Sequence, residues 1–102
     1  MNIIHKNIND ILYVYLQGEL DECSAKLARD KLDGLFLKEK YDEVIFDFTL
    51  LDFMDSTGIG VLIGRYKILK SKCKNAYISN PNSTIEKIIN MSGIYEIMPK
   101  IS

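Results

Sequence analysis

The chain has 102 residues, which is enough for one hydrophobic core and too few for two. A hydrophobic fraction of 47%, a charged fraction of 26% and a net charge of −1 are ordinary for a globular domain. The sequence has none of the clustered arginines of a nucleic-acid binder, no apolar run near the roughly 20 residues of a membrane span, and no signal-peptide pattern. We therefore expect a cytoplasmic protein that contacts neither nucleic acid nor membrane directly.

The N-terminal part of the chain predicts a β-hairpin. Residues 3–8 and 11–17 are short runs rich in β-branched and aromatic residues, and the turn dipeptide Asn9-Asp10 separates them. The second run is apolar or aromatic on both faces, so we expect each face to be covered at least in part. Gly18-Glu19-Leu20-Asp21 ends this run.

A first helix is expected after Asp21. Apolar residues recur at helical spacing from Ala25 to Phe36, and the pattern ends near residue 37. Either Asp21 or Ser24 can cap the first turn, because each has a short side-chain oxygen that can accept a free backbone N–H.

The middle of the chain predicts a strand, a loop and a second helix. The near-continuous apolar run 44–48 is typical of a central parallel strand. A loop over residues 49–55 leads into the helix, so the order of elements matches half of a βαβ unit. The helix has an apolar stripe on one face, formed by Ile59, Leu62, Ile63, Tyr66 and Leu69.

The start of this second helix combines a cap, a hydroxyl and two glycines. Asp55 or Ser56 is expected at the N-cap. A hydroxyl there lies beside unsatisfied N–H groups and the positive end of the helix dipole, a favourable place for a phosphate. Gly60 and Gly64 share a face away from much of the apolar stripe, and each costs about 1 kcal/mol relative to alanine. We therefore expect another surface to come close to the backbone there.

The C-terminal part predicts a further strand and helix, and a last strand. Residues 76–78 form a short strand, and Ser83-Thr84-Ile85-Glu86 has the pattern of a capping box. The helix that follows ends at Ser92-Gly93, and Ile97-Met98 is a candidate last strand before Pro99. Three isoleucines are expected to form the buried face of this helix: Ile85, Ile88 and Ile89.

These elements predict an α/β fold in a single domain over residues 1–102. Its sheet is small and mixed, with an N-terminal hairpin and largely parallel strands. About three helices are packed on this sheet.

The residues capable of chemistry form no catalytic pattern. The only histidine, His5, has no partner nearby in sequence, and Gly58-Ile59-Gly60 lacks the later Gly-Lys-Ser/Thr of a P-loop. Cys23 and Cys73 lie far apart without metal-type spacing, and we interpret both as reduced thiols that serve packing. We therefore expect no enzymatic activity, no metal site and no cofactor.

The stretch Asp55-Ser56-Thr57-Gly58, extended through Gly60 and Gly64-Arg65-Tyr66-Lys67, resembles a known phosphorylation-site region. That region belongs to the anti-sigma factor antagonists of the STAS domain family. Two further pieces match, Gly18-Glu19-Leu20-Asp21 before the first helix and Met91-Ser92-Gly93 after the third. The resemblance covers nearly the whole chain and is greatest to the sporulation branch, which acts in the sigma F pathway.

The resemblance implies a function and a site. The family's motif serine is phosphorylated by the partner kinase, and here it corresponds to Ser56. The first implied partner is an anti-sigma factor that is also a serine kinase. The dephosphorylated form binds it, and a sigma factor is thereby freed. The second implied partner is a serine phosphatase that reverses the modification. Asp21 is then a kinase contact, although the residue alone indicates only a cap. The implied partner-binding residues are Asp21, Asp55, Thr57, Gly58, Ile59, Gly60 and Gly64.

One feature departs from the family. Its sporulation members usually continue into a fourth, C-terminal helix, whereas this sequence stops at Ser102. We expect the core to close without that helix, or a partner or second copy to cover the gap. The oligomeric state stays open, with a monomer favoured. Some family members are reported to bind purine nucleotides, and no residue here identifies such a site.

Other interpretations of the same residues remain open. Ser56 can be an ordinary N-cap. Asp47, Asp52 and Asp55 could gather around Mg²⁺ as in a receiver domain, but a receiver has an acidic pair after its first strand, where this chain has Gln17-Gly18. A STAS domain can also serve another assembly, such as a general-stress regulator or an accessory subunit of a lipid transporter.

Overall fold

The computed structural model describes residues 1–101, and Ser102, the last residue of the predicted domain, lies outside the described residues. β1 (Asn2–Ile8) and β2 (Ile11–Leu20) pair antiparallel, which confirms the predicted hairpin. Asn9 and Asp10 form its turn with φ values of 52° and 64°. A two-residue hairpin turn with both residues left-handed matches the twist of the strands, and Asn and Asp tolerate that conformation.

The sheet is mixed, with the order β1-β2-β3-β5. β3 (Glu43–Asp47) runs parallel to the first half of β2, and β5 (Asn75–Ser79) runs parallel to β3. A further short strand, β4 (Leu51–Met54), pairs in parallel with the second half of β2, beyond the end of β3. β4 lies where the sequence predicts only a loop, so that part of the prediction is wrong.

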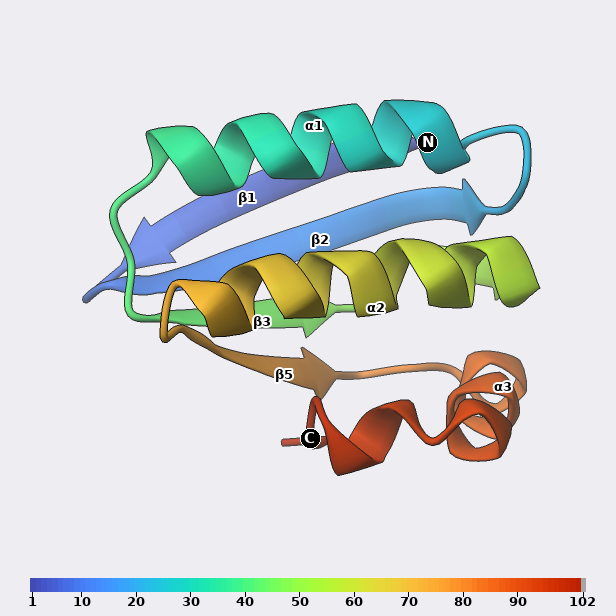
Figure 1. Ribbon diagram of the computed structural model, residues 1–102. Helices are drawn as coiled ribbons and strands as arrows, with labels where there is room; N and C mark the ends of the chain where they lie inside the picture. Colours follow the sequence, from blue (N-terminus) through green and yellow to red (C-terminus); the bar gives the residue numbers. More distant parts are fainter. Residues whose placement is uncertain (102) are drawn as a thin grey trace.

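Figure 1 shows α1 (Ala25–Lys38) and α2 (Ser56–Ser71) side by side on the same face of the sheet. Beneath them Leu12, Val14 and Leu16 of β2 are fully buried, while the residues that alternate with them are only half-buried. α3 (Ser83–Ser92) lies beyond the end of β5 and is followed by the short 3₁₀ helix η1 (Ile94–Glu96). The predicted fold class, a small mixed sheet with about three helices, is confirmed.

The buried stripe of α2 is rotated by about one residue from the predicted one. Leu62 and Leu69 are buried as expected, but Ile59, Ile63 and Tyr66 are only half-buried. The residues of α2 that are buried against the sheet and α1 are Gly58, Val61, Leu62, Arg65 and Leu69.

The C-terminal elements differ from the prediction in two details. The N-cap of α3 is Asn82, whose Oδ1 accepts the Ile85 N–H at 2.9 Å. The predicted capping box of Ser83 and Glu86 does not form, because Glu86 instead accepts hydrogen bonds from Tyr95 and Lys100. No strand forms at Ile97-Met98. Instead, Ile78 of β5 donates its N–H to the Pro99 carbonyl at 3.0 Å and accepts from the Ile101 N–H at 2.9 Å. Proline fits there because only its carbonyl is needed.

Candidate functional site

The N-terminus of α2 is capped by Asp55, which settles the choice between the two predicted caps. Asp55 has an extended backbone, and its side chain accepts the Gly58 N–H at 3.1 Å. Ser56 is therefore the first helical residue. Its side chain is exposed, and no hydrogen bond of its hydroxyl occurs among residues 1–101. The arrangement leaves this hydroxyl beside the positive end of the helix dipole and free to react.

Parallel pairing brings Asp21 and Asp55 to neighbouring places. Leu20 pairs with Met54 at the ends of β2 and β4, and the Asp55 N–H donates to the Leu20 carbonyl at 3.3 Å. Each aspartate directly follows one of these paired residues, and adjacent strands lie about 4.8 Å apart. The structure therefore places the two aspartates, far apart in sequence, at the same end of the sheet.

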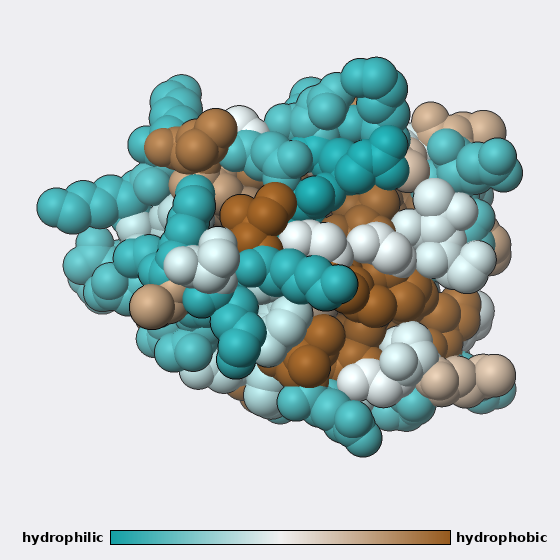
Figure 2. All heavy atoms as spheres, in the orientation of Figure 1, coloured by the Kyte–Doolittle hydropathy of each residue, from teal (hydrophilic) through white to brown (hydrophobic). Residues whose placement is uncertain are grey.

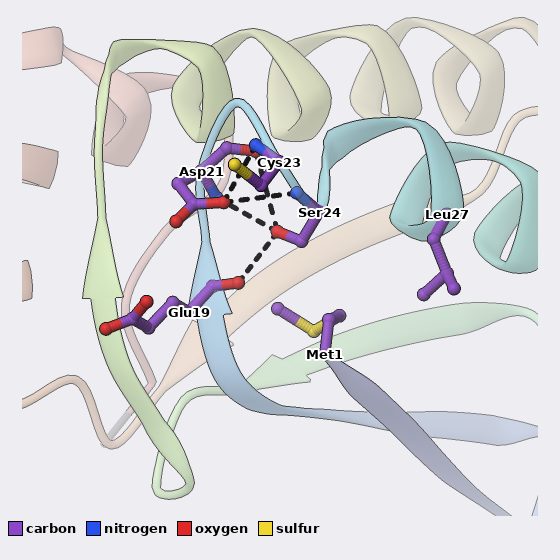
Figure 3. Close-up of a pocket in the computed structure, with 6 residues that line it drawn as sticks. All are labelled: Met1, Glu19, Asp21, Cys23, Ser24 and Leu27. Carbon is purple, nitrogen blue, oxygen red and sulfur yellow. Dashed lines mark hydrogen bonds between the residues drawn. The ribbon is translucent and has the colours of Figure 1, made fainter.

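Figure 3 shows how Asp21 is held in the turn before α1. Its Oδ1 accepts the backbone N–H groups of Cys23 at 3.0 Å and of Ser24 at 3.1 Å. Ser24 occupies the N-cap position of α1, but its hydroxyl donates to the Glu19 carbonyl at 2.7 Å and makes no cap bond to the helix. One oxygen of Asp21 thus holds the turn, while the other points away from it in Figure 3.

Three glycines near the site have different surroundings. Gly58 is buried, and a Cβ there would lie 2.6 Å from the Leu20 carbonyl oxygen and 2.6 Å from Met54 Cγ. By contrast, a Cβ on Gly60 or Gly64 would meet no atom of another part of the described chain within 4 Å. Gly58 therefore allows α2 to approach the sheet, whereas Gly60 and Gly64 leave the outer face of the helix bare.

The remaining predicted site residues of α2 are partly covered by the rest of the domain. Thr57 and Ile59 are half-buried, in contrast to the exposed Ser56. Ile59 also borders an open groove of about 300 Å³ between α2 and α3, which the sequence does not predict. The groove is lined by Asp55, Ser56, Ile59, Ile88, Met91 and Ser92.

A hydrogen-bonded carboxylate supports the chain behind the site. Asp47, at the end of β3, accepts the Thr49 N–H at 2.9 Å and the Asn80 side-chain N–H at 3.0 Å. Burial alone raises the pKa of Asp47, but the bonds from Thr49 and Asn80 outweigh it, so that the pKa lies below its usual value. Asn82 adds a bond to the Leu51 carbonyl at 3.2 Å. These contacts connect the start of α3 to the segment that leads into α2.

Comparison with known proteins agrees with this architecture. A model of the STAS domain matches residues 2–102. The anti-sigma F factor antagonist of Paenibacillus polymyxa is 33% identical over 89 residues, which cover 87% of this chain and 76% of that protein. The chain belongs to the STAS domain family, as an anti-sigma factor antagonist.

Relatives of this STAS domain include antagonists from two pathways. The anti-sigma-B factor antagonist of Bacillus subtilis is 31% identical over 101 residues, covering 96% of this chain and 90% of that protein. The anti-sigma factor antagonists are a non-enzymatic family that binds anti-sigma factors. Among residues 1–101, no helix is long and apolar enough to cross a membrane.

Solved structures share the fold of this STAS domain over almost its entire length. The Bacillus cell fate determinant SpoIIAA in its phosphorylated form has a TM-score of 0.72 at 25% identity, and the match covers 99% of this chain and 92% of that chain. An anti-sigma factor antagonist from Mycobacterium paratuberculosis has a TM-score of 0.85 at 15% identity, over 97% and 83% of the two chains. The second likeness bears on the fold alone.

Proposed function

We propose that this STAS domain is a cytoplasmic, phosphorylation-controlled antagonist of the sporulation sigma F pathway. Its dephosphorylated form binds an anti-sigma factor that is also a serine kinase, and the sigma factor is thereby released. The kinase phosphorylates Ser56 and ends the interaction, and a serine phosphatase restores it. The observation that carries this proposal is the exposed Ser56 hydroxyl at the start of α2, with the cap already supplied by Asp55.

The proposed switch acts through charge on the surface and not through unfolding. A phosphate adds about −1.5 to −2 charges. It would lie beside Asp55 and near Asp21, while the helix N-terminus accommodates it locally. The fold of this chain matches SpoIIAA in the unphosphorylated and phosphorylated forms almost equally, with TM-scores of 0.73 and 0.72. Both forms of that relative thus have this fold, as a switch that leaves the fold intact requires.

The proposed docking surface is the outer side of the α2 N-terminus. Asp21, Asp55, Thr57 and Ile59 form its edges, and Gly60 and Gly64 let the partner approach the helix backbone. Gly58 contributes differently, because it is buried and sets the position of the helix. The close approach that the glycines permit would be lost if a phosphate kept the partner at a distance.

Phosphopeptide mapping tests the modification. The purified chain is incubated with a candidate anti-sigma kinase and ATP, with Ser56→Ala as the control. We expect one phosphoryl group on Ser56 and at most a trace on Thr57, which is less exposed. A phosphate mainly on Thr57, or equal labelling of Ser56→Ala, would refute the assignment.

A second candidate is a STAS domain that regulates another assembly, either a general-stress regulator or a lipid-transporter accessory subunit. The similarity to the anti-sigma-B antagonist of Bacillus subtilis, which covers 96% of this chain, favours the stress pathway among these. Parallel titrations with an anti-sigma F and an anti-sigma B factor separate the two branches. Tighter binding to the anti-sigma F factor is expected, and the reverse order would favour the stress pathway.

A further inference from the structure

The groove between α2 and α3 contains the proposed phosphorylation site within its wall. Ser56 and Asp55 lie at one side, and Ile88 and Met91 of α3 lie at the other. Figure 2 shows hydrophobic atoms gathered along the boundary between these two helices, on the right of the view. A kinase that brings its reacting phosphate to the Ser56 hydroxyl therefore comes close to this groove.

The apolar surface of α3 is larger than its core contacts require. Ile85 and Ile89 are fully buried, and Ile88 also packs against the core. Ile88, predicted to be buried with them, is partly exposed, and Met91 is 88% exposed. Met91 thus contributes little to folding, and a flexible thioether side chain of this kind is typical of adaptable binding surfaces.

The charge of the groove explains how one added group could close it. Asp55 is the only ionisable side chain in its lining, and no lysine or arginine lines it within the described residues. A phosphate on Ser56 would therefore stay without a cationic partner from the groove itself. The same wall would change from mainly apolar to strongly anionic. An apolar group docked against it would then remove water from the unpaired phosphate, which costs free energy.

We infer that this groove is a docking pocket for one uncharged apolar side chain of the anti-sigma kinase. Ile59, Ile88 and Met91 form its apolar wall. The pocket is open when Ser56 is unmodified and is closed to that side chain by the phosphate. This inference rests on the proposed function and adds α3 to the interface, so that affinity depends on two helices and not only on the start of α2.

The position of α3 is fixed by contacts on its far side. Glu86 accepts hydrogen bonds from Lys100 at 2.8 Å and from the Tyr95 hydroxyl at 3.1 Å, and burial with this second bond raises the pKa of Tyr95 to about 12. Asn82 bonds to the Leu51 carbonyl at the start of the helix. The groove is therefore formed before the partner arrives, which lowers the entropy cost of docking.

The test places a charge in the groove at a residue that the fold does not need. Met91→Lys is compared with Leu37→Lys, a change at a 78% exposed residue near the C-terminal end of α1, and with the conservative Met91→Leu. We expect Met91→Lys to weaken binding of the dephosphorylated chain at least about tenfold. Leu37→Lys and Met91→Leu should bind like wild type, and all three variants should keep the wild-type melting temperature.

Kinetics of Ser56 phosphorylation provide a second readout. For Met91→Lys the KM for the antagonist should rise while kcat stays the same, because the change affects docking and not the reacting atoms. Wild-type affinity in Met91→Lys would overturn the inference. A second outcome would also overturn it: wild type self-associates, and Met91→Lys becomes monomeric but still binds the kinase normally. A second copy of the chain, and not the kinase, would then occupy the groove.

The controls also separate this inference from the proposed function. If wild type binds the kinase and Ser56→Asp does not, the proposed function stands. The Met91 variants alone then test whether the groove is a docking pocket. If wild type binds no anti-sigma kinase, or binds it regardless of Ser56, the proposed function fails and the inference falls with it.

Discussion

The inner and outer faces of α2 use the same residue type for opposite purposes. On the inner face, Gly58 lies so close to the Leu20 carbonyl that a side chain has no room. On the outer face, Gly60 and Gly64 border open space, and no contact with another part of residues 1–101 explains the absence of a side chain. The comparison teaches that the inner glycine serves the fold, and that the outer two are free to serve a partner.

Arg65 is a charged residue on the buried, inner face of α2. Its Nε lies 2.9 Å from Asp33 Oδ1 of α1, but the two atoms are not aligned as a hydrogen bond, and the Arg65 side chain is only 10% exposed. The pair is therefore an ion pair that joins two helices. Gly64-Arg65-Tyr66-Lys67 thus contains a structural residue within a motif that the family resemblance connects with function.

The largest effect is expected from Gly58→Ala. The added methyl would collide with the backbone oxygen of Leu20, which cannot move away as a side-chain tip can. Overpacking typically costs about 1–3 kcal/mol, and we expect the upper end, about 3 kcal/mol, in urea denaturation. A Gly58→Ala protein as stable as wild type would contradict the assignment of this glycine to the fold.

Asp47→Asn tests the support behind the site. The hydrogen bonds that lower the pKa of Asp47 favour its charged form, so the variant should lose about 1–3 kcal/mol of stability at pH 7. The sign follows from linkage. A carboxyl with a lowered folded-state pKa contributes stability above its unfolded pKa, about 3.9, and loses it as pH falls through the folded value.

The difference between Asp47→Asn and wild type should therefore shrink as the pH is lowered below about 4. Denaturation at several pH values measures this, and binding of the folded variant to the anti-sigma kinase should be unchanged at pH 7. A stability difference that is independent of pH would show that packing, and not charge, is what Asp47 contributes.

Ser56→Asp and Ser56→Ala test the outer face of α2. Ser56→Asp supplies one charge of the phosphate, and we expect binding to weaken more than tenfold, at least about 1.4 kcal/mol. Ser56→Ala should still bind. Titration of the kinase gives the affinities, and the melting temperature of Ser56→Asp should move little, because a carboxylate is favourable at a helix start. A large drop would show that the phosphate acts by unfolding.

Local patterns in the sequence predicted most of the fold, whereas the family resemblance supplied the candidate site residues, whose roles stay a prediction. The hairpin and the β3–α2 unit each follow from short-range signals. The sequence did not predict β4, because only its end residues, Leu51 and Met54, are buried. Buried and exposed residues therefore do not alternate along this strand. The cap of α3 was misplaced because Asn82 and Ser83 are both good caps, and the choice depends on the contact between Asn82 and Leu51.

The groove and the role of Gly58 needed tertiary contacts. Ser56 and Met91 are 35 positions apart in the chain, and no local pattern indicates that they share a cavity. The three glycines look alike in sequence, and only the approach of α2 to Leu20 separates the inner one. That approach also explains why the buried stripe is rotated from the predicted one, since it turns the Gly58 side of the helix toward the sheet.

The smallest effect, and the sharpest test of the outer face, is expected from Gly60→Ala. Because a Cβ at Gly60 meets nothing within 4 Å, alanine should raise the stability of the helix by about 1 kcal/mol. If a partner lies against this face, the same methyl should weaken kinase binding by about 1 kcal/mol, the lower end of overpacking. Gly64→Ala, one turn further from Ser56, should stabilise equally and weaken binding less.

Thermal denaturation and titration of the kinase on the same samples measure the stability and the affinity. A docking face should show higher stability together with lower affinity, whereas a solvated face would show only the higher stability. If Gly60→Ala bound the kinase as tightly as wild type, this part of α2 would not belong to the docking surface.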